Sequence, residues 1–270
     1  MTMTNQSQIE KIIGEKALSI SPIDTGLTND NFHVTTKTRD LVLRLPKIEN
    51  AHLFDYPHEY LVLNLIKNLS LEPELISYDP KTGIKCATYI EDAHTLSSNH
   101  YLDAVELIAR LHNANLTSGK DFHLEEQFEL YKPAHPIHNL DPYKDFITQA
   151  EALKSHIRLC HNDCVEGNFL FTKDNSYLID FEYALDNDPY FDLMSLITEN
   201  DITDKKARKE IIEHYFSLVD IPFDPIKLKV FEGALLVLWC AWACSMYEIH
   251  KEKIYKDIAD LKYLRLLQLD

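Results

Sequence analysis

The segment from residue 157 to residue 182 most strongly limits the folds open to this chain, because apolar runs enclose a polar loop. One run ends at Leu159 before the loop, and a second run, 169–171, follows it. Turn-forming residues at 174–175 then separate that run from a third, 177–179. We therefore expect a strand, a loop and a β-hairpin, in which a buried framework fixes the direction of the polar side chains.

The polar residues of this segment have the types and spacing of a phosphoryl-transfer site. His161, Asp163 and Asn168 form the pattern HxDxxxxN, and Asp180 follows the next apolar run. Phosphoryl transfer needs positioning and charge neutralisation more than covalent participation by the protein. We expect Asp163 to accept a hydrogen bond from the substrate hydroxyl and to orient it toward the γ-phosphate, while His161 braces the loop.

Asn168 and Asp180 are the predicted metal ligands. Both offer hard oxygen atoms from neighbouring segments of one hairpin, and Mg²⁺ prefers such ligands together with water and nucleotide phosphates. The alternative is an ordinary turn followed by acids on a solvated loop, but the flanking apolar runs favour a site. The predicted catalytic residues are thus Asp163, Asn168 and Asp180, with ATP and Mg²⁺ as cofactors.

Composition limits the partners and the compartment. A chain of 270 residues, 45% of them hydrophobic, can bury a core in one or two lobes. Its net charge of -16 disfavours nucleic acid and anionic membranes as partners, because both attract basic surfaces. Five cysteines without framework spacing, and a start unlike a signal peptide, predict a cytoplasmic protein. The longest apolar run, Ala234 to Cys244, is too short to cross a bilayer, so we expect no membrane insertion.

The first third of the chain is predicted to form an antiparallel sheet with one helix. Residues 20–45 have the pattern of two strands around a polar loop at 25–31, and residues 72–90 that of a further hairpin. Between them, residues 56–69 carry apolar side chains at helical spacing.

Arg44 and Glu59 are expected to form an ion pair at the nucleotide phosphates. Period two along the run 41–45 places Arg44 on the face opposite the leucines. Glu59 lies near the start of the predicted helix, where the alternative explanation is an acid favoured by the helix dipole alone.

The second hairpin is expected to end at a lobe boundary. We predict a nucleotide-binding lobe over residues 1–91, in which Ile90 and Glu91 offer backbone groups to adenine, and a catalytic and substrate-binding lobe over residues 92–270. Helices are predicted in the second part at 99–113 and 142–156, with a long connection at 118–136.

The order of these elements and the HxDxxxxN pattern resemble the protein-kinase-like and aminoglycoside phosphotransferase-like superfamily, and more narrowly the choline/ethanolamine kinase family. The loop 161–168 is similar to that family's HNDxxxGN loop, and residues 180–183 match its DFEY. Residues 191–199 and 26–29 also resemble family segments. The compact length is similar to that of bacterial Lic-type choline kinases. This resemblance implies an α+β, two-lobed fold with an N-terminal antiparallel sheet, one N-terminal helix and a larger, mainly helical C-terminal lobe.

The same resemblance implies which residues contact the nucleotide. They come from the predicted glycine-containing loop, the Arg44–Glu59 pair and the lobe boundary: Thr28, Asn29, Asn31, Arg44, Glu59, Tyr89, Ile90 and Glu91.

Trp239 and Trp242 indicate the substrate, because they lie one helical turn apart and choline-kinase-like proteins carry a similar WxxW. A quaternary ammonium is held by aromatic faces and diffuse negative charge. The alternative is that both tryptophans simply pack in a core. The full set of predicted substrate contacts is Asp163, Glu182, Tyr183, Tyr190, Glu199, Trp239 and Trp242, with Tyr247 as a further candidate.

The predicted function is transfer of the γ-phosphate of MgATP to choline, giving phosphocholine and ADP. Ethanolamine, thiamine or an aminoglycoside are alternative substrates on the same fold. A non-catalytic nucleotide-binding module is the alternative from a different class, although the base and metal residue types are all present.

Overall fold

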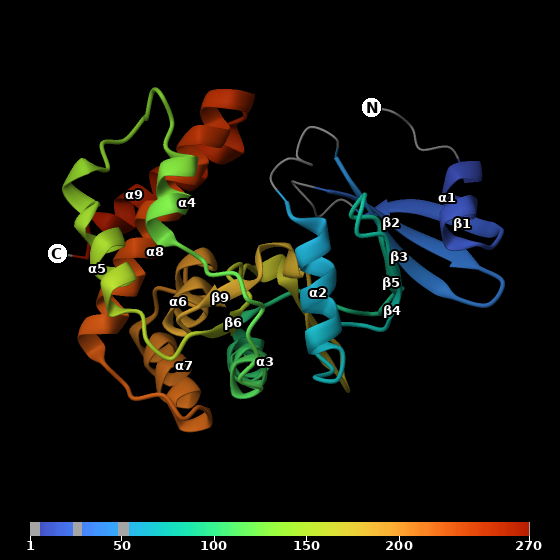
Figure 1. Cartoon of the computed structure of the whole chain (residues 1–270), viewed down its shortest axis with the longest axis horizontal. Helices are drawn as coiled ribbons and strands as arrows, with labels where there is room; N and C mark the ends of the chain where they lie inside the picture. Colours follow the sequence, from blue (N-terminus) through green and yellow to red (C-terminus); the bar gives the residue numbers. More distant parts are fainter. Residues whose placement is uncertain (1–5, 24–28, 48–53, 270) are drawn as a thin grey trace. The chain divides into compact units, whose positions relative to one another are not determined.

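The computed structural model describes residues 6–23, 29–47 and 54–269. The chain divides into two compact units. The first unit contains Met1–His100 and Gly167–Ala184, and the second contains Tyr101–Glu166 and Leu185–Asp270. The division of function at residue 91 stays a prediction. Figure 1 shows both units, with labels on most of their helices and strands.

A five-stranded antiparallel sheet forms the body of the first unit, in the order β1-β2-β3-β5-β4. Its strands are β1 (Ala17–Ile23), β2 (Asn29–Thr36), β3 (Asp40–Pro46), β4 (Leu75–Tyr78) and β5 (Lys85–Thr88). Residues 20–45 therefore belong to three strands and not two. The missed turn has neither glycine nor proline, and the Thr36 hydroxyl oxygen closes it by accepting the N–H groups of Thr38 and Arg39.

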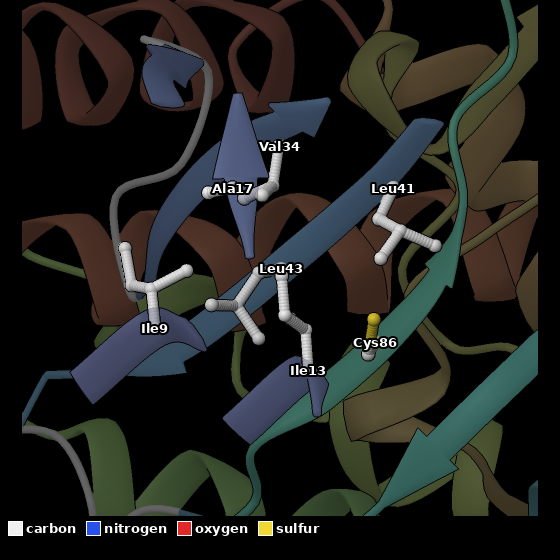
Figure 2. Close-up of a cluster of buried hydrophobic side chains, with 7 residues drawn as sticks. All are labelled: Ile9, Ile13, Ala17, Val34, Leu41, Leu43 and Cys86. Carbon is white, nitrogen blue, oxygen red and sulfur yellow. The ribbon is translucent and has the colours of Figure 1, made fainter. Parts of the chain in front are cut away.

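The alternation along β3 separates a core face from a polar face, as predicted. Leu41 and Leu43 are buried in a hydrophobic cluster that also includes Ile9 and Ile13 from helix α1 (Gln6–Ile13) (Figure 2). Arg44 points to the opposite face. Helix α1 was not predicted, so the first unit has two α-helices in its described part.

Helix α2 (Tyr56–Ile66) confirms the predicted helix, although it ends three residues early. Asp55 caps it by accepting the His58 N–H at 3.0 Å, and proline occupies the first turn. Buried Val62 and Ile66 fix the rotation of the helix. This rotation directs Glu59, which is 2% exposed, toward the interior.

The predicted hairpin after the catalytic loop is confirmed and belongs to the first unit. Strand β7 (Phe169–Phe171) pairs antiparallel with β8 (Ser176–Leu178). Backbone hydrogen bonds in both directions join Phe171 to His94, and the Leu178 N–H donates to the Leu71 carbonyl oxygen. Segments remote in sequence thus build one unit.

The second unit is mainly helical. Its α-helices are α3 (Tyr101–Asn113), α4 (Leu124–Tyr131), α5 (Asp145–Leu153), α6 (Tyr190–Glu199), α7 (Lys205–Leu218), α8 (Pro225–His250) and α9 (Lys253–Leu266). Two short strands, β6 (Arg158–Cys160) and β9 (Leu185–Asn187), pair antiparallel. A short 3₁₀ turn, η3 (Asp141–Tyr143), also lies in this unit, whereas η2 (Ser98–His100) and η5 (Phe181–Tyr183) lie in the first unit and η4 (Glu166–Asn168) spans the boundary.

Helix α4 corrects the prediction of a long connection at 118–136. Its buried residues Leu124, Phe128 and Tyr131 have helical spacing. The surrounding polar residues and the prolines that follow outweighed this short pattern in the sequence.

Helix α8 is the central helix of the second unit. By length and composition it could span a membrane, but 72% of its most apolar window is buried inside the protein. It packs against α4, α5, α6 and α9. Its apolar character is therefore explained by the core that it forms.

We predict that Gly83→Ala destabilises the protein more than Gly14→Ala. Both glycines have a φ of +72°, but a Cβ at residue 83 would lie 2.4 Å from the Tyr56 ring, whereas none of the described atoms lies within 4 Å at residue 14. We expect losses in the free energy of unfolding of about 2–4 and about 1 kcal/mol, respectively, in urea titrations. Equal losses would contradict the close approach of Tyr56.

Candidate functional site

A cavity of about 300 Å³ lies against the polar face of the first unit's sheet. Of the residues predicted to contact the nucleotide, Asn31, Arg44, Tyr89 and Ile90 line it. The predicted metal ligand Asp180 lines it as well. The cavity therefore brings residues predicted to bind the nucleotide together with one predicted metal ligand, and all of them belong to one unit.

The other predicted nucleotide contacts have separate positions. Glu59 is buried and accepts a hydrogen bond from Arg44. Glu91 is exposed and follows β5, and Asn29 is the first residue of β2. Thr28 lies outside the described residues. The roles of these residues toward a nucleotide stay predictions.

Arg44 is a buried cation among three carboxylates, and it is only 5% exposed. Its Nη2 donates to Glu59 Oε2 at 2.6 Å and to the Gly83 carbonyl oxygen at 3.2 Å. Its Nη1 donates to Asp180 Oδ1 at 2.9 Å. Burial opposes its charge, but Glu59, Asp180 and Glu182 together raise the pKa of Arg44 well above its ordinary value. The predicted Arg44–Glu59 pair is confirmed.

The backbone of Asp180 is held in an unusual conformation. Its φ of 68° and ψ of 67° lie in the left-handed region, which costs a non-glycine residue about 1–2 kcal/mol. Its N–H donates to Glu72 Oε1 at 3.0 Å, and Lys85 Nζ binds the same carboxylate at 2.6 and 2.7 Å. The Glu72–Lys85 pair thus holds the backbone of Asp180, while Arg44 binds its carboxylate.

Glu72 and Lys85 line the cavity but were missed by the sequence analysis. The alternation of faces along β5 could have indicated Lys85. Lys85 and Ala87 line the cavity, whereas Cys86 between them points into the hydrophobic cluster. Glu72 precedes its strand, and no local pattern marks it.

Asp180 and Asn168 have the donor atoms that a magnesium ion requires. Within the described residues, Asp180 Oδ2 has no hydrogen-bond partner, and the side chain is 30% exposed. The backbone carbonyl oxygen of Asn168 accepts the N–H of Ile179, so Asn168 lies beside the residue that precedes Asp180. Oxygen atoms of a carboxylate and an amide suit Mg²⁺.

Glu182 and Tyr183 also lie in the first unit. The Glu182 side chain is 5% exposed, accepts a hydrogen bond from Asn29 Nδ2 at 3.0 Å and lies 3.8 Å from Arg44. Burial and the nearby Asp180 charge raise the pKa of Glu182 well above its ordinary value. The Tyr183 ring packs edge-on against Phe54, with ring centres 5.4 Å apart. Their predicted contacts with substrate stay predictions.

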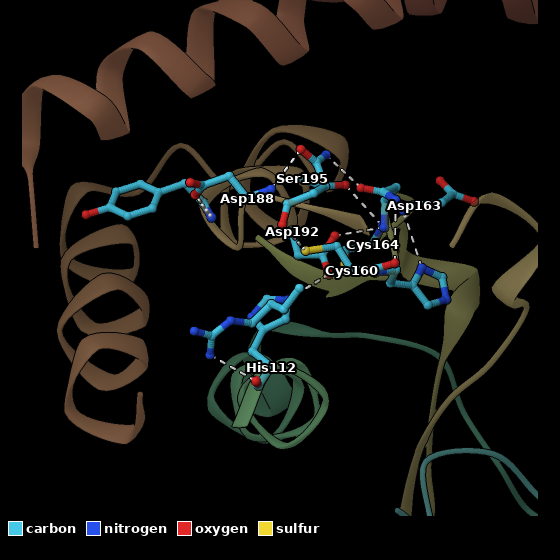
Figure 3. Close-up of polar contacts among 12 residues, drawn as sticks. His112, Cys160, Asp163, Cys164, Asp188, Asp192 and Ser195 are labelled. Atoms are coloured by element: carbon cyan, nitrogen blue, oxygen red, sulfur yellow. Dashed lines mark hydrogen bonds and ion pairs between the residues drawn. The ribbon is translucent and has the colours of Figure 1, made fainter. Parts of the chain in front are cut away.

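In the second unit, a buried carboxylate supports the loop that carries Asp163 (Figure 3). Asp192 is 0% exposed and accepts the backbone N–H groups of His161 and Asn162, both at 2.7 Å. The next N–H, of Asp163, donates to His161 Nδ1 at 3.3 Å, which confirms His161 as a brace. The fourth, of Cys164, donates to Ser195 Oγ at 3.0 Å. Four successive loop amides are therefore fixed.

Asp192 is itself held by His112. The Nε2 atom of His112 lies 3.0 Å from Asp192 Oδ2, and its Nδ1 atom lies 2.7 Å from the Tyr215 hydroxyl. Burial alone would raise the pKa of Asp192, but the hydrogen bond and charge of His112 and the charge and N–H of His161 lower it. The ligand atoms of His112, Cys160 and Asp192 lie within 4.8 Å of one another. Because His112 and Asp192 already bind each other and the loop, we interpret this cluster as a structural brace.

An aromatic row lies in the same unit. It consists of Tyr131, Trp239, Trp242 and Tyr255, whose successive ring centres are 6.1, 6.2 and 5.8 Å apart. Burial and the charge of Asp163 raise the pKa of Tyr131, which places Asp163 near one end of the row. The two predicted tryptophans therefore contact each other near the predicted catalytic acid.

Tyr131 and Tyr255 were missed because they come from helices α4 and α9, and only the folded chain brings them to the tryptophans. Tyr190, in contrast, is 1% exposed, and its hydroxyl donates to the Pro222 carbonyl oxygen at 2.7 Å. Its ring packs near Phe231 in the core. The structure thus argues against Tyr190 as a substrate contact, because it offers no exposed face.

Glu199, the last predicted substrate contact, ends helix α6. Its side chain is 10% exposed and pairs with the buried Lys262 at 2.9 Å. Tyr247 is half-buried, and the Lys251 ammonium lies 5.5 Å from its ring centre. Asp163, Glu199, Trp239 and Trp242 therefore lie in the second unit, whereas Asn168 and Asp180 lie in the first.

Comparison with known proteins identifies related sequences. A family model described as "Phosphotransferase enzyme family" matches residues 19–225. Protein LicA of Haemophilus influenzae is 27% identical over 249 residues, covering 84% of this chain and 73% of that protein. A LicA homolog of Mycoplasma capricolum is 27% identical over 202 residues, covering 72% of this chain and 80% of that protein.

Two solved structures share the fold. Choline kinase LicA from Streptococcus pneumoniae superposes with a TM-score of 0.84, at 23% identity, over 97% of each chain. LicA in complex with AMP gives a TM-score of 0.79, at 24% identity, over 98% of this chain and 99% of that one. The predicted α+β, kinase-like fold with an N-terminal antiparallel sheet and a mainly helical C-terminal part is confirmed.

We predict that Asp192→Asn loosens the loop and destabilises the protein in a pH-dependent way. The amide cannot accept both backbone N–H groups, so we expect a loss in unfolding free energy of roughly 2–4 kcal/mol at pH 7. The folded pKa of Asp192 lies below the unfolded value of about 3.9, so its stabilisation is present above that pH and disappears as the pH falls through the folded pKa.

Urea titrations of wild type and Asp192→Asn between pH 7 and pH 3 measure this difference. It should narrow toward the acid end. Asp220→Asn is the matched control at an exposed aspartate of the same unit, and it should have little effect at any pH. A difference that is constant over this range would contradict the ionised brace.

Proposed function

Because this chain belongs to the phosphotransferase enzyme family, we propose that it transfers the γ-phosphate of MgATP to the hydroxyl of choline. The products are phosphocholine and ADP. The observation that most favours choline as the substrate is the aromatic row near Asp163. A quaternary ammonium has no N–H to donate, and aromatic faces attract it with about 0.5–2 kcal/mol each. The name of the Streptococcus pneumoniae relative, a choline kinase, supports the same substrate.

ATP binds in the cavity of the first unit in this proposal. Tyr89 and Ile90 follow β5 at the cavity wall, where backbone groups are available to adenine. Arg44 and Lys85 supply positive charge, but both already pair with carboxylates. The phosphates therefore need further cations, which agrees with a magnesium-dependent reaction. The related LicA structure with AMP supports a nucleotide at this fold.

Asn168 and Asp180 would hold the magnesium ion, for which the open Oδ2 of Asp180 is a suitable ligand. The ion supplies charge neutralisation at the nucleotide phosphates when it is bound. Arg44 holds the Asp180 carboxylate in place through the 2.9 Å hydrogen bond. Glu72 fixes the Asp180 backbone. Arg44 and Glu72 therefore position the ligand Asp180 before the nucleotide arrives.

Asp163 orients the choline hydroxyl in this proposal. A carboxylate is too weak a base to deprotonate an alcohol beforehand, so Asp163 accepts the proton late, as the bond from the hydroxyl oxygen to the γ-phosphorus forms. The bond between the γ-phosphorus and the ADP oxygen breaks in the same step. The amides fixed by Asp192 hold the loop in one conformation while this happens.

The five cysteines are free and buried, which fits a reducing cytoplasm. Ethanolamine remains the rival substrate, because its primary ammonium prefers hydrogen-bonding carboxylates.

We predict that Asp163→Ala lowers kcat by at least about 100-fold while the affinity for ATP is retained. Magnesium-dependent ADP release with choline, ethanolamine, thiamine or an aminoglycoside measures turnover, and calorimetric titration with ADP measures binding. Choline should stimulate the wild type most. Stimulation by none of these alcohols would indicate a binding module, and near-normal turnover of Asp163→Ala would remove Asp163 from the chemistry.

A further inference from the structure

Glu199 and Lys262 form a buried ion pair in the second unit. Their side chains are 10% and 4% exposed, and Lys262 Nζ lies 2.9 Å from Glu199 Oε2. The same ammonium donates to the Thr198 carbonyl oxygen at 2.8 Å. The Thr198 hydroxyl donates to Glu199 Oε1 at 3.1 Å. Both carboxylate oxygens of Glu199 are therefore engaged within the protein.

This ion pair is near the proposed choline site. Asn200, which follows Glu199, donates from its Nδ2 to the backbone carbonyl oxygen of Cys164 at 2.8 Å, and Cys164 directly follows Asp163. Glu199 and the catalytic acid thus lie close to one residue. Helix α9 supplies the second link, because Tyr255 and Lys262 are seven residues apart, which is two turns on one face.

Both of these α9 residues are buried, at 7% and 3% exposure. Tyr255 contacts Trp242 of the aromatic row, with ring centres 5.8 Å apart, and Lys262 contacts Glu199. One face of α9 therefore supports the aromatic row with a ring and compensates the nearby carboxylate with a cation.

We propose that Lys262 is a specificity-determining residue that favours a quaternary over a primary ammonium. This inference rests on the proposed function and concerns the same site. A primary ammonium carries three N–H donors, which lose their water on binding and need acceptors in exchange. Glu199 is the buried carboxylate that could accept them, and Lys262 already occupies it. Choline has no such donors, so it loses nothing by this arrangement.

The test is the ratio of kcat/KM for choline to kcat/KM for ethanolamine in Lys262→Met. The methionine keeps the approximate length of the side chain and removes its charge, which leaves Glu199 available to a substrate ammonium. We expect this ratio to fall at least tenfold, mainly because the KM for ethanolamine falls, while the KM for ATP is unchanged. A ratio within twofold of wild type, in a variant with native circular dichroism, would overturn the inference.

Two further variants separate specificity from general damage. Arg265→Met is the matched control, because Arg265 lies three residues after Lys262 on α9 and pairs with Asp201, and both of these side chains are partly exposed to solvent. It should leave the ratio unchanged. The double variant Lys262→Met/Glu199→Gln removes both charges and should return the choline preference toward that of wild type. A double variant as altered as Lys262→Met would contradict the role of Glu199.

Glu199→Gln alone decides the question if Lys262→Met does not fold. It leaves the Lys262 cation uncompensated, so the KM for choline should rise at least tenfold with the KM for ATP unchanged. An unchanged KM for choline would overturn the inference. If neither alcohol stimulates ADP release by the wild type, the proposed function itself fails, and this result is distinct from a failure of Lys262 to set the preference.

Discussion

The first unit depends on the burial of a single guanidinium. Arg44 joins β3 to α2 through Glu59 and to the returning hairpin through Asp180. A charge that is 5% exposed is tolerated only when it is paired and hydrogen-bonded. The residues that satisfy Arg44 come from three distant parts of the sequence. The need to pair one cation therefore also brings the proposed metal ligand to the wall of the proposed nucleotide cavity.

The second unit uses the opposite charge in a similar way. Asp192 is fully buried and ionised, and it is satisfied by His112 and by two successive amides of the loop. A carboxylate that accepts several N–H groups fixes backbone more firmly than side-chain packing does, because each hydrogen bond specifies a direction. The loop backbone that carries Asp163 is thereby held in one conformation, although the Asp163 side chain itself is partly exposed. In both units, a buried charge holds the proposed site residues in place.

Local periodicity predicted much of this arrangement. The alternation along β3 placed Arg44 correctly, helical spacing placed Glu59, and two turn residues placed the β7–β8 hairpin. These features depend on neighbours within a few residues. The β1–β2–β3 region was misjudged because the turn before Asp40 is closed by a threonine hydroxyl, which carries no strong sequence signal.

The features that could not be predicted depend on contacts between distant segments. Glu72 lies before β4 and Lys85 begins β5, so their ion pair forms only in the folded first unit, and Lys262 meets Glu199 only when α9 packs in the second unit. Tyr131 was hidden in a stretch whose polar composition outweighed its short helical pattern. Tyr190 was predicted to contact the substrate because it lies near a site motif in the sequence. In the folded chain it is buried in the core.

The most direct measurement is a crystal structure with a non-hydrolysable ATP analogue, Mg²⁺ and choline. We expect magnesium bound at about 2.1 Å by oxygens of Asn168 and Asp180. We also expect the choline hydroxyl within about 3.2 Å of the Asp163 carboxylate, and the trimethylammonium group against Trp242. Choline bound away from Asp163, or magnesium bound without Asp180, would contradict the proposed mechanism.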